Sequence, residues 1–267
     1  MADGPVVILT GASRGMGAEI ARRLAQAGAR LTLVARSADS LKEIAEEVRR
    51  LGGEGLPFSA DIAGQTGCNE AIRETIDRFG RIDALINNAG LLGPIAPVAD
   101  ANPDAWRYNI EVNLLGPFFL THAALPHLRT ARGRIINISS GAAVKSIQGW
   151  SAYCTAKAGL THFTRILAEE EPDVVSVAVR PGVVDTQMQE MIREEGPGAM
   201  SEDKVDYFQT LKSDNKLEPP HIPARSVAWL ALHAPREMSG EFVEYDDSKI
   251  AVPAVAVFGD TLESFDR

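Results

Sequence analysis

The chain has 267 residues, 45% of them hydrophobic and 24% charged, which is enough to bury the core of one large α/β domain without disulfides or metals. Its formal net charge of -9 argues against binding to nucleic acid or to an anionic membrane. Two cysteines exclude a disulfide framework and suit a reducing compartment, and no signal peptide or membrane-length apolar run is present, so we expect a cytoplasmic protein.

Strand and helix signals alternate through the first two-thirds of the chain. Short apolar runs predict strands that are buried on both faces of a sheet, at 6–9, 31–34, 55–59, 84–86, 134–138 and 174–179. Amphipathic segments between them predict helices at 16–28, 38–51, 65–79, 103–130 and 152–170. Pro117 is expected to bend the fourth helix. We therefore predict an α/β fold with a single-domain, Rossmann-like doubly wound parallel sheet of about seven strands, flanked by helices.

The alternating pattern breaks after about residue 185. Residues 186–220 are rich in charge, glycine, proline and methionine, and they predict an irregular loop or lid over a substrate site. Residues 222–234 are helical again, and 241–245 predict a last edge strand that would complete a domain of residues 1–247. We assign no role to the tail at 248–267.

A glycine-rich turn follows the first predicted strand and opens the first predicted helix. Glycines let a backbone turn sharply and approach a pyrophosphate closely, and a helix start offers unpaired N–H groups to it. The turn would bind a dinucleotide through Gly11, Ser13, Arg14, Gly15, Met16 and Gly17. A tight turn without any ligand is the alternative, because the glycine spacing differs from the common dinucleotide pattern.

The end of the second predicted strand bears on the choice of nucleotide. NAD sites usually carry an acidic residue there, but this chain has Arg36 followed by Ser37. A guanidinium at Arg36, joined by Arg14 from the glycine turn, would bind a 2′-phosphate through charge-assisted hydrogen bonds. A solvated surface charge is the alternative for each arginine, and the pair together favours NADP(H).

Three polar residues form a candidate catalytic group. Tyr153 and Lys157 lie four residues apart and share one helix face, and Ser140 follows the fifth predicted strand. Carbonyl reduction needs a proton for the developing alkoxide, so we predict Tyr153 as general acid and Ser140 as the group that holds the substrate oxygen. An ammonium about 4 Å away is worth about 4 kcal/mol, enough to lower a phenol pKa by about 3 units. A second Tyr-x-x-x-Lys, at 245–249, lacks the upstream serine.

Together these motifs resemble the short-chain dehydrogenase/reductase family over residues 5–247. The resemblance implies that Asn113 kinks its helix and holds a water beside Lys157, and that Tyr153 and Lys157 also contact the cofactor, Lys157 through its ribose. Further cofactor contacts would come from Asp61, Ile62, Asn88, Ala89, Gly90, Pro181, Gly182, Val184 and Thr186. Alternatively, Asn88 only ties two strands together and Asp61 only caps a turn.

Within that family, several segments resemble the sepiapterin reductase and benzil (diketone) reductase subgroup, which implies reduction of a vicinal dicarbonyl or an aromatic ketone. Trp150 and Met188 would be apolar walls of the substrate site, or else core residues. Glu244 matches the acidic residue with which sepiapterin reductases anchor the pterin, although those have aspartate there.

The resemblance also implies a homodimer or homotetramer, because oligomers of the family commonly pair the helices near 103–130 and 152–170. A non-catalytic NADP-binding sensor or scaffold on the same fold is the rival hypothesis, which the intact catalytic group disfavours. We predict no metal site, because the five histidines lack ligand spacing.

Overall fold

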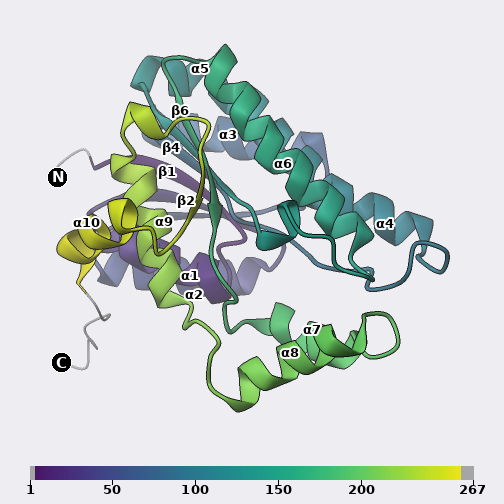
Figure 1. Cartoon of the computed structure of the whole chain (residues 1–267). Coiled ribbons are helices and arrows are strands. Elements are labelled where there is room, and N and C mark those ends of the chain that lie inside the picture. The colour runs from purple at the N-terminus through teal and green to yellow at the C-terminus, as the bar shows by residue number, and fades with distance from the viewer. Residues whose placement is uncertain (1–3, 260–267) are drawn as a thin grey trace.

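The computed structural model describes residues 4–259, and a seven-stranded parallel sheet in the order β3-β2-β1-β4-β5-β6-β7 runs through its centre (Figure 1). The strands are β1 (Val6–Thr10), β2 (Arg30–Ala35), β3 (Glu54–Ser59), β4 (Ala84–Asn87), β5 (Arg134–Ile138), β6 (Val175–Arg180) and β7 (Phe242–Glu244). Every neighbouring pair is parallel, with β7 at one edge. The predicted doubly wound Rossmann-like sheet is confirmed.

The central strands are apolar on both faces because helices cover both. In β1, every residue is buried, and Val7 and Leu9 face one helical layer while Ile8 faces the other. Strand β1 pairs with both β2 and β4, so the strand order reverses between β1 and β4. At such a reversal the connections leave in opposite directions and open a crevice beyond the carboxyl ends of the strands.

Two helical layers enclose the sheet (Figure 1). One layer contains α1 (Gly15–Gln26), α2 (Ala38–Arg50), α9 (His221–His233) and α10 (Ser248–Phe258). The other contains α3 (Gln65–Phe79), α4 (Pro103–Ile110), α5 (Gly116–Ala131) and α6 (Ser151–Glu170). No helix within residues 4–259 is both long enough and apolar enough to cross a membrane.

The helix predicted at 103–130 is interrupted by a π-helical segment, Glu111–Leu115. Asn109, near the end of α4, donates to the backbone oxygens of Leu91, Leu92 and Gly93 at 3.2, 2.9 and 2.7 Å. Pro117 lies in the first turn of α5, and the helix runs into it without a break because Leu115 and Gly116 have helical backbone angles. The irregularity therefore lies in the π segment that directly precedes the turn with Pro117.

The segment 186–220 is largely helical, which corrects the predicted irregular loop. It forms α7 (Gln187–Glu195) and α8 (Glu202–Ser213), which lie together beyond one end of the sheet (Figure 1). Acidic residues in the first turn of α8 and Lys212 in its last turn complement the helix dipole. Only a narrow apolar face of the two helices, with Ile192 and Phe208, packs inward. Most of their other residues are charged or polar, which is why the composition predicted a loop.

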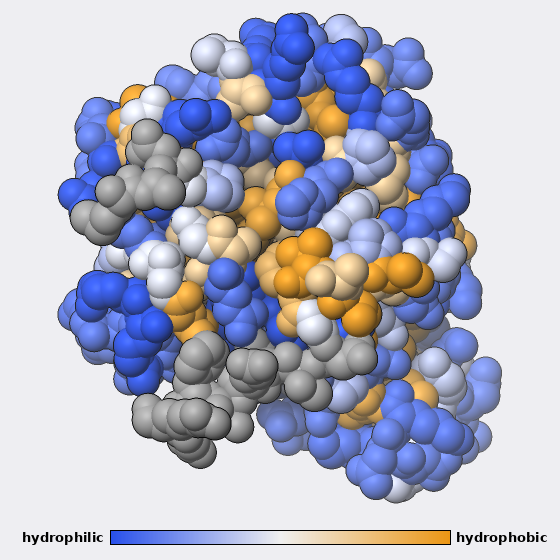
Figure 2. All heavy atoms as spheres, turned by 90° about the vertical axis from the view of Figure 1, so that its left-hand side faces the viewer, coloured by the Kyte–Doolittle hydropathy of each residue, from blue (hydrophilic) through white to orange (hydrophobic). Residues whose placement is uncertain are grey.

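The expected tail contains a further helix, α10, which packs on α9 and α1 beyond the predicted domain boundary at residue 247. Ile250 is fully buried in the core, while Val252 is 67% exposed on the outer face. Buried Arg23 donates to the carbonyl oxygen of Phe258 at 2.8 Å, and Arg225 to that of Gly259 at 2.9 Å. Figure 2 shows hydrophobic side chains gathered on the side of the molecule where α10 lies. Residues 260–267 lie outside the described part.

If α10 belongs to the folding unit, Ile250→Ala should lower the free energy of unfolding by about 2–5 kcal/mol, because it leaves a cavity in the core. Val252→Ala, on the exposed face of the same helix, should change it by less than about 0.5 kcal/mol. Urea unfolding followed by circular dichroism measures both. Equal, small effects of the two substitutions would contradict the assignment of α10 to the core.

Candidate active site

A cavity of about 640 Å³ lies at the carboxyl edge of the sheet, beyond the ends of β1, β2, β4, β5 and β6. This volume suits a small organic ligand. Its walls include nearly all of the predicted site residues: Gly11, Ser13, Arg14, Gly15, Met16, Gly17, Arg36, Ser37, Asp61, Ile62, Asn88, Ala89, Gly90, Ser140, Trp150, Tyr153, Lys157, Pro181, Gly182, Val184, Thr186 and Met188. Two predicted residues, Asn113 and Glu244, lie outside its walls.

The glycine turn brings the start of α1 to one end of the cavity. Gly11 and Gly15 have φ angles of 66° and 53°, which side chains disfavour. A Cβ atom on Gly11 would lie 2.8 Å from the Cα of Ala89, so the turn packs directly on the chain after β4. The N-cap residue of α1, Arg14, makes no side-chain cap, whereas the start of α2 is capped by the Ser37 hydroxyl. The first N–H groups of α1 therefore suit an anion such as a pyrophosphate.

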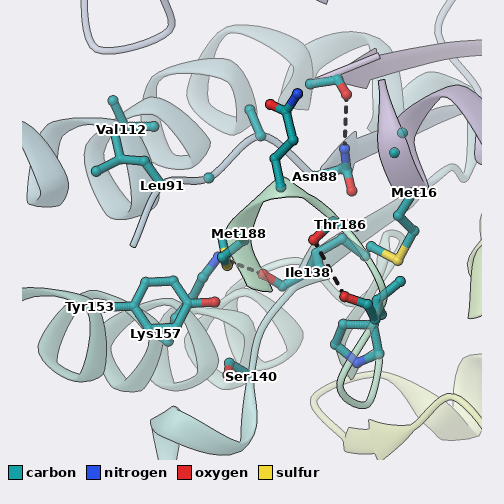
Figure 3. Close-up of a pocket in the computed structure, with 18 of the residues that line it drawn as sticks. Met16, Asn88, Leu91, Val112, Ile138, Ser140, Tyr153, Lys157, Thr186 and Met188 are labelled. Atoms are coloured by element: carbon teal, nitrogen blue, oxygen red, sulfur yellow. Dashed lines mark hydrogen bonds between the residues drawn. The ribbon is translucent and has the colours of Figure 1, made fainter. Parts of the chain in front are cut away.

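Asn88 ties the ends of β1 and β4 together. Its side-chain nitrogen donates to the Thr10 carbonyl at 2.9 Å (Figure 3). The Thr10 hydroxyl accepts from the backbone N–H groups of Asn88 and Ala89, both at 3.0 Å. The strand-tying alternative for Asn88 is thus present in the structure, and the residue lines the cavity as well.

Next to the glycine turn, Tyr108 links Arg36 to Asp61. The Arg36 guanidinium donates to the Tyr108 hydroxyl at 3.2 Å, which in turn donates to Asp61 at 2.7 Å. The other Asp61 oxygen accepts from the Ala63 N–H at 3.0 Å, so Asp61 also caps a turn. Burial, followed by the Asp61 carboxylate, raises the pKa of Tyr108, which keeps this phenol protonated as a donor. Tyr108 lines the cavity and was missed, since no sequence spacing relates it to Arg36.

At the other end of the cavity, Tyr153 and Lys157 are buried on the same face of α6, with Ser140 nearby (Figure 3). The Lys157 ammonium lies 5.6 Å from the centre of the Tyr153 ring. It donates to the carbonyl oxygen of Ile138 at 2.7 Å. The structure therefore places the side chains of Ser140, Tyr153 and Lys157 together at one end of the cavity, called the catalytic end below.

The pKa values of Tyr153 and Lys157 differ from the sequence expectation, in which the lysine lowers the pKa of the phenol. Burial raises the pKa of Tyr153 to about 12, and the Ser140 hydroxyl opposes the rise. Burial also lowers the pKa of Lys157 to about 8. Burial is the largest cause of both shifts, so the expected lowering of the Tyr153 pKa by Lys157 is not found. Tyr153 holds its proton firmly at neutral pH, which suits a proton donor.

Asn113 is fully buried in the π segment, behind the cavity wall. Its side-chain nitrogen donates to the carbonyl oxygen of Leu91 and to Oδ1 of Asn109, both at 2.8 Å. A Cβ atom on Gly90 would lie 2.8 Å from Oδ1 of Asn113 and 3.6 Å from Nζ of Lys157. Asn113 and Lys157 therefore both lie close to Gly90, where a side chain would overlap Asn113.

Apolar side chains from three segments close the catalytic end. Trp150 stacks on Phe208 of α8, with ring centres 5.5 Å apart, and meets the edge of Tyr153 at 6.0 Å. Met188 and Ile192 of α7 complete this wall. Trp150 and Met188 were predicted as walls, whereas Ile192 and Phe208 were not predicted to line the site.

Arg180, the last residue of β6, also lines the catalytic end and was missed. Its guanidinium pairs with Glu244 at 2.5 Å. Glu244 was predicted to contact substrate, but its carboxylate is turned to this arginine at the rim. The neighbouring Tyr245, from the second Tyr-x-x-x-Lys, packs instead against Gly182.

A profile of the short chain dehydrogenase family matches residues 5–197. An uncharacterized oxidoreductase of Schizosaccharomyces pombe is 39% identical over 243 residues, covering 90% of this chain and 96% of that protein. A benzil reductase ((S)-benzoin forming) of Saccharomyces cerevisiae is 33% identical over 260 residues, covering 92% and 98%.

Solved structures share the fold over nearly the same length. A short chain dehydrogenase/reductase from Saccharomyces cerevisiae has a TM-score of 0.88 and 34% identity, covering 93% of this chain and 99% of that one. An NAD⁺-bound xylitol dehydrogenase has a TM-score of 0.82 and 26% identity, covering 90% and 97%.

Burial of the Lys157 charge has a consequence for stability without any ligand. Its pKa is about 8 in the folded protein and 10.5 when unfolded, so the unfolded chain binds more protons between these values and wild-type stability rises with pH there. Lys157→Met carries no such charge. Its stability relative to wild type should therefore fall by roughly 1–3 kcal/mol as the pH rises from about 8 to about 10.5. Urea unfolding at a series of pH values measures this difference, and a difference that stays constant with pH would contradict the burial of a charged lysine.

Proposed function

The chain belongs to the short-chain dehydrogenase family, and from this premise we propose that it reduces a ketone or a vicinal dicarbonyl to an alcohol, with NADPH as reductant and Tyr153 as general acid. The observation that carries the proposal is the cavity itself. One end meets the uncapped start of α1, and the other end holds Tyr153, Lys157 and Ser140 together.

Ser140, Tyr153 and Lys157 have separate roles in the proposed reaction. When bound, the reduced nicotinamide supplies two electrons and one of the two hydrogens that the reduction needs. Ser140 donates a hydrogen bond to the substrate oxygen, and Tyr153 gives that oxygen its proton. A phenol with a pKa of about 12 remains proton-loaded at neutral pH. Lys157, with a pKa of about 8, carries a charge beside the tyrosinate that remains and stabilises it.

Side chains at the adenosine end support NADP(H) as the cofactor. Arg36 and Arg14 both line the cavity, and no carboxylate occupies the position of Arg36 at the end of β2. Tyr108 fixes the guanidinium of Arg36 through a hydrogen bond. The xylitol dehydrogenase of the same fold carries NAD⁺, so the preference depends on these side chains and not on the fold.

The catalytic end supports an aromatic or otherwise apolar carbonyl substrate. Trp150, Met188, Ile192 and Phe208 form its wall, and a relative at 33% identity is a benzil reductase. These observations favour a benzil-like diketone over a pterin. Glu244, the residue expected to anchor a pterin, does not line the cavity and pairs with Arg180 instead.

We further propose a cytoplasmic homodimer or homotetramer that pairs α5 and α6 with their copies. Phe118 on α5 is 42% exposed and Ile166 on α6 is 40% exposed. Phe118 also lies against Phe163 of α6, with ring centres 6.0 Å apart, so the two helices present one apolar surface.

Tyr153→Phe removes the proton donor and keeps the ring. NADPH consumption with benzil should fall by roughly 10²- to 10⁴-fold. NADPH binding, measured by fluorescence titration, should remain within about threefold, since the variant keeps the cavity shape. Near-normal turnover would refute the role of Tyr153, and wild-type protein that binds NADPH but reduces no carbonyl would support the sensor alternative.

Arg36→Asp replaces the proposed phosphate-binding cation with the acidic residue typical of NAD sites. The KM for NADPH should rise roughly 10- to 100-fold, with NADH affected far less, because a charge-assisted pair is lost and repulsion takes its place. Arg50→Asp is the matched control, since it makes the same charge change on the exposed far end of α2. An unchanged ratio of the two KM values in Arg36→Asp would refute the cofactor assignment.

A further inference from the structure

We propose that Arg180 binds the second carbonyl oxygen of a vicinal dicarbonyl substrate and so selects 1,2-dicarbonyls over simple ketones. The proposal rests on the proposed function and names the residue that sets its substrate class. Arg180 is a substrate-binding residue in this scheme, and Glu244 is a positioning residue that acts through it.

The position of Arg180 places its guanidinium beside the reacting centre. It ends β6, next to β5, whose chain continues directly into Ser140. A Cβ atom on Gly141 would lie 3.1 Å from Nε and 3.4 Å from Nη2 of Arg180. The guanidinium therefore rests on the residue that follows Ser140, the proposed donor to the first substrate oxygen. A glycine at position 141 leaves room for this approach.

The hydrogen bonding of the guanidinium leaves one edge available to a ligand. Nη1 donates to Glu244 at 2.5 Å, and the register of β6 and β7 sets the two residues directly opposite each other. Within residues 4–259, Glu244 is its only hydrogen-bonding partner. The side chain of Arg180 is 30% exposed and lines the cavity. Its Nε–H and Nη2 groups are thus donors at the catalytic end, since a guanidinium has N–H donors and no acceptor.

The charge balance indicates which acceptor fits. Glu244, whose side chain is 58% exposed at the rim, already compensates the positive charge of Arg180. An ion pair of this kind favours a neutral acceptor such as a carbonyl oxygen over a second carboxylate. Apolar side chains of Trp150, Met188 and Phe208 share this wall with polar ones such as Gln189 and Lys204. A donor in the wall loses its water when a substrate fills the site, so a substrate without a matching oxygen is penalised.

A 1,2-dicarbonyl carries two oxygens on adjacent carbons and meets both requirements. One oxygen would take the proton from Tyr153 while bonded to Ser140, and the other would accept from Arg180. Reduction of the first carbonyl gives an α-hydroxy ketone, and the second carbonyl remains unreduced and bonded to the guanidinium. A simple ketone would leave the Arg180 donors without a partner.

The test compares benzil with deoxybenzoin, in which a methylene group replaces one carbonyl. Steady-state kcat/KM is measured for both in wild type, Arg180→Leu and Arg180→Lys, and the benzil-to-deoxybenzoin ratio is compared between variants so that intrinsic reactivity cancels. Arg180→Leu should lower the ratio at least roughly 10-fold, mainly through the KM for benzil, and Arg180→Lys should restore part of it. Arg236→Leu, which breaks an exposed ion pair with Asp173, should leave the ratio unchanged.

A second variant tests the positioning role of Glu244 even if Arg180→Leu does not fold. Glu244→Gln leaves the guanidinium charge uncompensated, so kcat/KM for benzoylformate should rise relative to its methyl ester by roughly 3- to 10-fold. Equal losses for benzil and deoxybenzoin in both Arg180 variants, or an unchanged acid-to-ester ratio in Glu244→Gln, would overturn the proposal. If wild type reduces neither ketone while binding NADPH, the proposed function itself fails.

Discussion

The contact between the ends of β1 and β4 is the constraint on which the site depends. Thr10 and Asn88 exchange hydrogen bonds through both backbone and side chains, which closes the sheet at the point where its strand order reverses. On one side of this contact the glycine turn leads into α1. On the other side the chain runs to Gly90, which lies close to both Asn113 and Lys157. One set of hydrogen bonds thereby connects the end of the cavity at the glycine turn to the end that holds Tyr153 and Lys157.

The catalytic end is held by burial more than by attraction between charges. Tyr153 and Lys157 both lie in surroundings that disfavour their ionised forms, which raises the pKa of the phenol and lowers that of the ammonium. Such a site costs stability, and it keeps a neutral acid next to an amine close to its titration point. Apolar side chains from α7 and α8 pack around this group, and Arg180 adds a polar group to the same cavity wall.

Much of the fold could be predicted because each strand is a short apolar run, and because apolar residues recur every three to four positions in most helices. That the glycine turn, Ser140, Tyr153 and Lys157 meet at one cavity could be predicted, because each lies at the carboxyl end of a strand or on one helix face. The link from Arg36 through Tyr108 to Asp61 could not, since it joins three separate segments. The pairing of Arg180 with Glu244 depends on the register of two strands that are far apart in sequence. Helix α8 was missed because a single buried aromatic, Phe208, is surrounded by charged residues.

Helix α10 ties the end of the chain to its beginning, and this affects the order in which the protein can be made. Buried Arg23, on the helix that follows the glycine turn, hydrogen bonds to the carbonyl of Phe258, some 235 residues later. During synthesis the first helix therefore waits for almost the whole polypeptide to leave the ribosome before its buried guanidinium gains this partner. The buried face of α1 that carries Arg23, although encoded first, is thus among the last to reach its final packing.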